Sequence, residues 1–393
     1  MLQSLRKGVA NDRFFLLLGI CLLIFLVSFF LPVTRKAANN IFYVGVALPT
    51  LACLLCYPYA LLAILRRYAD VLLLLAGLML LYAWRDPSDL KQLLYLTLLL
   101  ASFAVLNVRS QDNCVRLFSV FAALAMMVLL ASILWWLWLY VSTGSWVRLT
   151  LWGGAENPVH AALMLSTLLT FVWLFHVDPR LIGRSVLWRY SAIILLVVLG
   201  MLCTMVFQAR SAILGLLLFL VGYLAWRRML LGGLLIVLGV LILCWVLGLQ
   251  NLLMERGVSF RLVIWQDVLD RVTHHCGLLL GCEPSSYRFL GQFYHPHNTY
   301  LALLYRTGVA GTLLFAAFTL TFFWIAVRGR SRWMLVSLIG WGAMLSSGSG
   351  IFSSPQPLWI YFWCPVLLAL LEVRPLLLQQ YLGGCVRSGS TSA

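Results

Sequence analysis

The sequence has few charged residues and very few acidic ones. Charged residues fill 10% of the 393 positions, and Asp and Glu together number 12 against 28 Lys and Arg. An average soluble domain carries about 25% charged residues. Hydrophobic residues fill 63% of the positions, and the mean hydropathy is +0.98. These values exclude a soluble protein and place most of the chain in a membrane.

The scarcity of acids also limits the chemistry. The sequence holds no Asp-x-Asp or paired-Glu motif that would bind Mg²⁺ or act as the acid–base couple of a glycosidase. It also lacks a glycine-rich phosphate loop and any nucleotide-binding motif. We therefore expect no bound metal and no cofactor, so the energy for a reaction must come from the substrate itself.

Apolar runs near the length of a membrane-spanning helix recur along the whole chain. Barrel strands would be shorter and would alternate, so we predict an all-α integral membrane protein with about 12 transmembrane helices. The predicted spans are 14–32, 41–64, 69–84, 92–108, 117–141, 159–176, 190–208, 211–226, 229–248, 299–326, 333–349 and 358–372. The cysteines lie mostly inside these spans, which argues against a disulfide scaffold.

The basic residues set the orientation of the chain. A net charge of +16 would suggest a nucleic-acid partner in a soluble protein. In a membrane protein, basic residues instead hold loops on the cytoplasmic side. With the N-terminus cytoplasmic, most Lys and Arg fall inside, so we expect membrane lipids and no nucleic acid as partners. Both termini are then cytoplasmic, and residues 14–32 form an uncleaved first helix.

One long loop divides the chain. We predict transmembrane helices 1–9 in residues 1–248, an outer-side loop in 249–298, helices 10–12 in 299–372 and a cytoplasmic tail in 373–393. Loops of this length in compact proteins are usually functional. Apolar residues recur between charged ones through 256–273, so the first half of the loop is expected to form an amphipathic helix on the membrane surface or over the bundle.

Several outer-side arginines gather around this loop. Arg210 lies between two spans with almost no loop, where a charge is costly unless it faces a cavity or pairs with an anion. The alternative is an interfacial anchor that reaches the lipid head groups. The planar fork of donors on arginine suits a diphosphate. We predict that Arg210, Arg261 and Arg288 bind a substrate diphosphate.

Other arginines admit a plainer interpretation. Arg271 lies four residues after Asp267, so we expect an ordinary ion pair on a helix surface. For Arg256 and Arg288 the residues alone leave the surface and the binding interpretations open. We place Arg256 among the residues that support the site.

The loop ends in His295-Pro296-His297-Asn298, directly before an apolar helix. A histidine with a pKa near 6.5 can accept a proton from an attacking hydroxyl at neutral pH. We predict His297 as the catalytic residue, with His295 in support. The plainer alternative is a helix-entry histidine satisfied by the backbone. Asn298 either orients the histidine or caps the following helix.

Sulfur and imidazole groups in the loop suggest two further interpretations. His274, His275, Cys276 and Cys282 precede the two later histidines, and Zn²⁺ prefers such ligands. Their spacing matches no standard four-ligand pattern, so we predict no metal site. Cys276 and Cys282 could instead form a small disulfide in an oxidising compartment.

A spacing pattern links these residues to a known family. Gly308 and Gly311 would let another helix or a lipid chain approach closely. The pattern His297-Asn298, nine residues, Gly308, two residues, Gly311-Thr312 resembles the signature of bacterial O-antigen ligases. Their relatives include O-antigen polymerases and protein O-oligosaccharyltransferases.

Two further motifs look like the family, and one departs from it. The matches are Ser259-x-Arg261-x3-Trp265 early in the loop and Gln208-Ala209-Arg210-Ser211 at the tight turn. The departure is Gly281-Cys282-Glu283-Pro284, where relatives often have a Gly-x-Gly turn. The first five spans carry no motif.

The resemblance implies transfer of a glycan from undecaprenyl diphosphate to a sugar hydroxyl of the lipid A–core oligosaccharide, in lipopolysaccharide biosynthesis. The reaction takes place at the periplasmic face of the inner membrane as a metal-independent, inverting glycosyl transfer. His297 would deprotonate or position the acceptor hydroxyl. Arg210 and Arg261 would stabilise the charge that grows on the diphosphate.

Other functions fit parts of the sequence. An O-antigen polymerase would use a second carrier-linked glycan as acceptor and share the same motifs. A protein O-oligosaccharyltransferase often carries an extra soluble C-terminal region, which we do not find in these 393 residues. A transporter for a lipid-linked glycan would place charged residues deep within several spans, whereas here the polar groups gather at one mouth.

Overall fold

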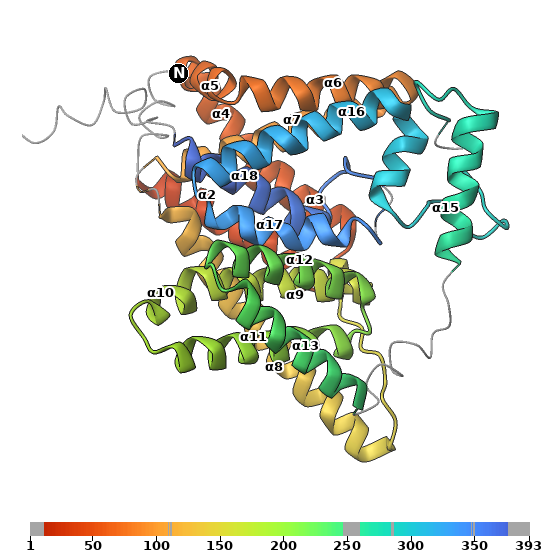
Figure 1. Cartoon of the computed structure of the whole chain (residues 1–393). Helices are drawn as coiled ribbons and strands as arrows, with labels where there is room; N and C mark the ends of the chain where they lie inside the picture. The colour runs from red at the N-terminus through yellow and green to blue at the C-terminus, as the bar shows by residue number, and fades with distance from the viewer. Residues whose placement is uncertain are drawn as a thin grey trace, which may run out of the picture.

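The computed structural model is built almost entirely of helices (Figure 1). It describes residues 12–108, 110, 112–246, 260–283, 287–346, 348 and 350–375. Within these ranges there is no named β-strand, only two isolated bridges in the loop after α15. The predicted all-α class is therefore confirmed.

The helical elements have the following bounds. Before the long loop they are α2 (Asp12–Ser28), α3 (Arg35–Ile41), η1 (Phe42–Ala47), α4 (Leu48–Cys56), α5 (Pro58–Arg67), α6 (Ala69–Arg85), η2 (Pro87–Asp89), α7 (Leu90–Leu106), α8 (Asn113–Thr143), η3 (Gly153–Ala155), α9 (Pro158–Val172), η4 (Trp173–Val177), α10 (Asp178–Leu181), α11 (Val186–Val206), α12 (Arg210–Trp226) and α13 (Leu230–Val246). From the loop onward they are α15 (Arg261–Asp270), η5 (Arg271–His275), α16 (Thr299–Arg328), α17 (Arg332–Ala343), η7 (Trp359–Trp363) and α18 (Cys364–Val373).

The described helices have the length and composition of a membrane protein. Five stretches are long and apolar enough to cross a bilayer: Arg35–Cys56, Asn113–Thr143, Pro158–Leu181, Val186–Val206 and Thr299–Arg328. Shorter apolar helices, among them α6, α7 and α12, accompany them. The chain is therefore a multi-pass membrane protein, and the total of twelve spans stays a prediction.

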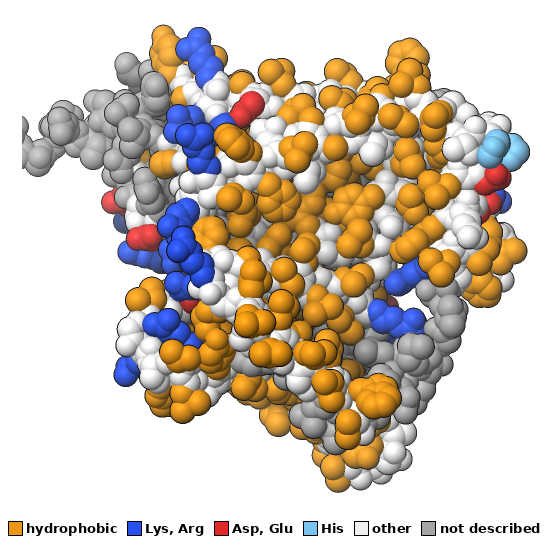
Figure 2. Space-filling model, viewed as in Figure 1, with side chains coloured by type: hydrophobic (Ala, Val, Ile, Leu, Met, Phe, Trp, Pro, Cys, Tyr) orange, Lys and Arg blue, Asp and Glu red, His pale blue; other side chains and the backbone are white. Residues whose placement is uncertain are grey.

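The two ends of the bundle differ. Hydrophobic side chains cover the middle of the visible face, and Lys and Arg gather at one end of it (Figure 2). The helix α15 stands across the opposite end (Figure 1), which we call the α15 end. The amphipathic helix predicted for 256–273 is present there over Arg261–Asp270 and continues as η5; the residues before Phe260 lie outside the described part.

The contact between α12 and α17 forms the centre of the bundle. A Cβ on Gly215 of α12 would come within 2.6 Å of the Ile339 carbonyl oxygen in α17. A Cβ on Gly342 of α17 would come within 2.7 Å of the Leu214 carbonyl oxygen. Because the glycines have no side chain, the two backbones are in direct contact, and this contact fixes the position of one helix along the other. This contact brings the start of α12 beside the end of α17.

The helix α16 is broken at Gly308, which has φ 63° and ψ −161°. Figure 1 shows its first part, at the α15 end, turned away from the long remainder. A turn from the long loop fills the break, since the Leu278 carbonyl accepts from Val309 N–H at 2.9 Å and the Leu279 carbonyl accepts from Ala310 N–H at 3.1 Å. The span predicted as one continuous helix therefore consists of two pieces.

Candidate functional site

The two histidines at the end of the loop lie against each other. Their ring centroids are 4.0 Å apart, and the His297 backbone N–H donates to Nδ1 of His295 at 3.3 Å. The Trp265 indole N–H of α15 donates to the Pro296 carbonyl at 3.2 Å. His297 has φ +54°, a left-handed conformation that is strained for a residue with a side chain. The surrounding contacts therefore hold His297 in one orientation.

The electrostatic surroundings keep His297 neutral. Its side chain is half-buried, and burial lowers its pKa to about 4, with further lowering by His295 and by the positive charge of Arg261. Burial also lowers the pKa of His295. At neutral pH both rings are uncharged, so His297 has a lone pair that can accept a proton.

Asn298 caps α16. Its Oδ1 accepts from the backbone N–H groups of Tyr300 at 2.9 Å and Leu301 at 3.1 Å. Its Nδ2 donates to the Leu345 carbonyl, also at 2.9 Å, and Thr299 N–H donates to the Met344 carbonyl at 2.9 Å. Of the two interpretations of Asn298, the cap is therefore observed. The residue also ties the chain next to His297 to the turn after α17.

Arg210 reaches the same turn from the other side. It is the first residue of α12 and is half-buried. The adjacent Ser211 hydroxyl donates to the Ser346 carbonyl at 3.2 Å and accepts from the Ser346 hydroxyl at 2.9 Å. Residues 344–346, which the sequence analysis placed inside a span, are thus a turn that carries Arg210 on one flank and His297 on the other.

The structure adds an arginine that the sequence analysis did not select. Arg148 lies in the loop between α8 and α9, and its Nε donates to the Phe207 carbonyl at 2.9 Å. Leu149 N–H donates to the Val206 carbonyl at 3.1 Å, so this loop runs beside the tight turn that precedes Arg210. The only signal in the sequence was a basic residue in the loop that also carries Gly153-Gly154.

The predicted arginines of the loop occupy different positions. Arg261 begins α15 and is half-buried, close enough to His297 to affect its pKa. Arg288 is exposed, and its guanidinium lies over the Tyr294 ring at 5.7 Å. Its position makes it the least favourable of the predicted diphosphate ligands. Arg256 lies outside the described residues.

Two further arginines are paired with acids. The Nε of Arg271 lies 2.9 Å from the Asp267 carboxylate, as predicted for a helix-surface ion pair. Arg306 forms an ion pair with Asp89, and its guanidinium lies over the Tyr82 ring at 4.4 Å. These two arginines are engaged within the protein and are not chosen as substrate ligands.

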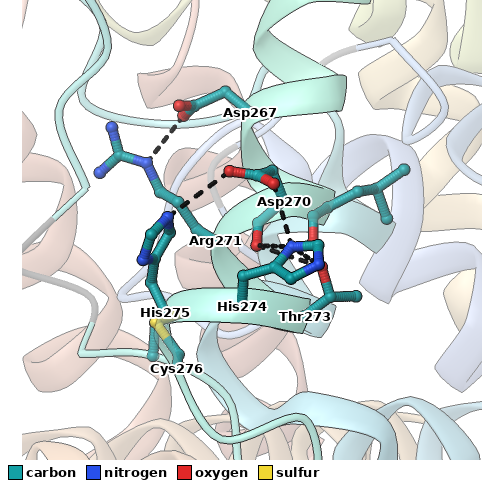
Figure 3. The surroundings of a disulfide bond; sticks show 9 residues. Asp267, Asp270, Arg271, Thr273, His274, His275 and Cys276 are labelled. Carbon is teal, nitrogen blue, oxygen red and sulfur yellow. Dashed lines mark hydrogen bonds and ion pairs between the residues drawn. A yellow bond between two sulfur atoms is a disulfide. The ribbon is translucent and has the colours of Figure 1, made fainter.

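The two cysteines of the loop are not available as metal ligands. Cys276 and Cys282 form a disulfide, the pairing that the sequence left open. His274 and His275 lie near the Asp270 carboxylate at 3.0 and 3.6 Å (Figure 3). Among the residues described, no group of three or more His, Cys, Asp or Glu side chains could hold a metal ion.

The glycines of the motif do not serve the purpose that the spacing suggested. A Cβ on Gly308 would lie 2.4 Å from the Leu279 carbonyl oxygen, and one on Gly281 would lie 2.5 Å from the Tyr305 carbonyl oxygen. Gly308 therefore admits the loop turn that fills the break in α16, rather than another helix or a lipid chain. A Cβ on Gly311 would meet the Thr307 hydroxyl of the same helix at 1.9 Å.

Comparison with known proteins gives one informative similarity. No protein-family model matches the chain. The chain is 26% identical over 362 residues to a protein named O-antigen ligase from Pseudomonas aeruginosa strain PAO1, and the match covers 85% of each protein. The similarity covers most of the chain, and it agrees with the resemblance seen in the motifs around His297 and Arg210.

Proposed function

We propose that the protein is an O-antigen ligase, a glycosyltransferase of lipopolysaccharide assembly. The donor is a glycan on undecaprenyl diphosphate, and the acceptor is a sugar hydroxyl of the lipid A–core oligosaccharide. The observation that carries this proposal is geometric: the half-buried His297 packs against His295, and its neighbour Asn298 and the Arg210 neighbour Ser211 bond to the same turn after α17. The similarity to the Pseudomonas aeruginosa protein supports it.

The proposed reaction is a single displacement. The acceptor oxygen attacks the anomeric carbon of the donor from the face opposite the diphosphate, and the new C–O bond forms as the old one breaks. His297 takes the proton of the acceptor hydroxyl. The bonding electrons leave with the diphosphate, whose growing charge is stabilised by Arg210 and Arg261, with Arg148 nearby.

Donor binding strengthens the base in this mechanism. A histidine with a pKa of about 4 is a weak proton acceptor, because its conjugate acid is strong. Part of the lowering comes from the positive charge of Arg261. A bound diphosphate would offset that charge and raise the pKa of His297. His297 would then accept a proton readily only when the donor is in place.

The α15 end would face the periplasm. Disulfides persist in oxidising compartments, and the Cys276–Cys282 disulfide lies in the loop at this end. Basic residues that favour the cytoplasmic side gather at the opposite end (Figure 2). Contacts also join arginines of separate helix ends to their neighbours, since Arg374 donates to the Arg67 carbonyl at 3.3 Å and Arg330 lies over the Trp226 ring at 5.4 Å. This arrangement supports a location in the inner membrane with both termini cytoplasmic.

Reconstitution of the purified protein tests the proposal. It would be supplied with undecaprenyl-diphosphate glycan and, in separate reactions, with lipid A–core or with more carrier-linked glycan as acceptor. Glycan on lipid A–core supports the ligase. Lengthening of the carrier-linked chain would make the protein a polymerase, and the absence of transfer to either acceptor would favour a transporter.

A further inference from the structure

A small ring of the long loop carries three exposed leucines and lies outside the proposed active site. The chain runs Cys276-Gly277-Leu278-Leu279-Leu280-Gly281-Cys282, and the disulfide closes it. We call residues 277–281 the leucine tip. Its ends meet in a tight turn, since Gly281 N–H donates to the Gly277 carbonyl at 2.7 Å. Leu278, Leu279 and Leu280 are 51%, 65% and 42% exposed. Turns that face water usually carry polar residues, so this surface fits an apolar partner.

Hydrogen bonds on both sides of the break in α16 hold the leucine tip in place. After the break, the backbone N–H groups of Val309 and Ala310 donate to carbonyls of the tip at 2.9 and 3.1 Å. Before the break, the Tyr305 carbonyl accepts from Cys282 N–H at 2.6 Å. The tip therefore lies beside Gly308, and the depth of Gly308 in the membrane sets the depth of the leucines.

The length of α16 places its break at a membrane boundary. Residues 309–328 form the part of α16 after the break, and at about 1.5 Å per residue they are about 30 Å long. The hydrocarbon core of a bilayer is also about 30 Å thick. Arg328, in the last turn of α16, marks one boundary of this core, because a charged side chain is costly within it. Gly308 then lies at the other boundary, on the side of the α15 end.

Exposed tryptophans lie at the same two levels. Trp324 is 67% exposed, and the Arg328 guanidinium lies over its ring at 5.6 Å. Towards the α15 end, Trp84 of α6 is 76% exposed. In the same turn of α6, the Tyr82 ring lies under the guanidinium of Arg306, near the break. Because Trp and Tyr are enriched where a membrane meets water, these residues support the boundary beside the leucine tip.

The backbone of the leucine tip suits this boundary. A backbone polar group that enters hydrocarbon must have a partner within the protein. The carbonyls of Gly277, Leu278 and Leu279 all accept hydrogen bonds, one from Gly281 and two from α16. The disulfide restricts the turn further, so little conformational freedom is lost when the leucines enter the membrane.

We propose that the leucine tip is a membrane anchor, with its side chains inserted among the phospholipid acyl chains of the leaflet at the α15 end. The partner is the lipid, because the exposed surface is apolar and lies at the edge of the hydrocarbon core. Cys276 directly follows η5, which continues α15, and α15 begins at Arg261. The anchor thereby holds α15 and Arg261 at the level of the lipid head groups. It requires only that α16 crosses the membrane and is independent of the proposed reaction.

Photo-crosslinking in phospholipid vesicles tests the anchor. A benzophenone amino acid replaces Leu279 in the full chain, which is reconstituted in phosphatidylethanolamine and phosphatidylglycerol. Leu320 is the membrane-facing control, because it is 72% exposed in the part of α16 after the break. His274 is the water-facing control, because its side chain is 70% exposed beside the Asp270 carboxylate. We expect the yield of acyl-chain adducts at Leu279 to lie within about threefold of the yield at Leu320 and at least about tenfold above that at His274.

Mass spectrometry of the adducts distinguishes the partners. Adducts on acyl chains support the anchor. Adducts on lipid head groups alone, adducts between two copies of the chain, or a yield at Leu279 no higher than at His274 would overturn it. The same probe at Leu278 replaces the one at Leu279 if that variant does not unfold thermally as the wild type does.

A second set of vesicles also contains a small molar fraction of undecaprenyl-diphosphate glycan. The adducts should remain on the phospholipids, which are in excess. A shift of the adducts to the polyprenyl chain would assign the leucine tip to the donor and would overturn the anchor. Transfer is not measured in either set, so a failure of the anchor is separable from a failure of the proposed function.

Discussion

Asn298 offers the sharpest structural test of how His297 is positioned. Its Oδ1 accepts from two backbone N–H groups of α16, and its Nδ2 holds the Leu345 carbonyl. Loss of the cap costs about 1 kcal/mol, and loss of the buried bond to Leu345 costs about 1 kcal/mol more. Asn298→Ala should therefore destabilise the protein by about 2 kcal/mol, or about 2 °C in Tm for a chain of this size.

Asn298→Ser separates the two roles. Serine caps a helix nearly as well as asparagine, so its Tm should lie close to that of the wild type. It cannot reach Leu345, so the segment that carries His297 keeps only the backbone bond from Thr299 to Met344 as its tie to the turn beside Arg210. Because a displacement of about 1 Å can reduce a rate about a hundredfold, we expect kcat to fall at least about tenfold in both variants.

Thermal unfolding in detergent and initial rates of glycan transfer provide the readouts. Asn157→Ala is the control, because Asn157 caps α9 in the same way, with Oδ1 accepting from Val159 N–H at 3.0 Å. It should lower Tm and leave kcat near the wild-type value. A wild-type kcat in Asn298→Ser, or an unchanged Tm in Asn298→Ala, would refute the reasoning.

Three further predictions follow from the same geometry. The neutral form of His297 persists down to its pKa of about 4, so kcat/KM should stay constant as pH falls and decline only near that value. Arg261→Gln removes a nearby positive charge and raises the His297 pKa. In a pH–rate profile, this variant should therefore show the decline at higher pH. Replacing Cys276 by Ser opens the disulfide and should cost about 2 kcal/mol by loop entropy, seen as a lower Tm; an equal Tm with and without reductant would contradict this. Gly308→Ala, with φ +63° and the Leu279 carbonyl 2.4 Å from the added Cβ, should displace the loop turn and reduce both Tm and transfer, and wild-type values would show that the break in α16 tolerates a side chain.

Hydropathy alone predicted the helical class, because a spanning helix must be long and apolar whatever it packs against. Each predicted span overlaps helical residues in the structure. The finer geometry depended on contacts between distant residues. The break at Gly308 exists because the carbonyls of Leu278 and Leu279 accept the backbone N–H groups that the break leaves free in α16. The local sequence of α16 does not predict these distant carbonyls.

The sequence nominates residues for the candidate site but does not give their arrangement in space. Arg210 and His297 lie in separate parts of the sequence, and their neighbours Ser211 and Asn298 bond to one turn because glycine contacts bring α12 against α17. The position of Arg148 was not predicted for the same reason, because it depends on hydrogen bonds to the distant turn at Val206 and Phe207. Arg271 was assigned correctly because its partner lies one helical turn away in the same helix.

The most direct test of the central claim is transfer by His297→Ala in proteoliposomes that contain donor and lipid A–core, in the presence of EDTA. His297→Gln serves as a second variant that keeps the side-chain volume, and binding of the donor is measured in parallel. We predict that both variants bind the donor as the wild type does and that transfer falls by at least about a hundredfold. Transfer at the wild-type rate in either folded variant would contradict the assignment of His297 as the base.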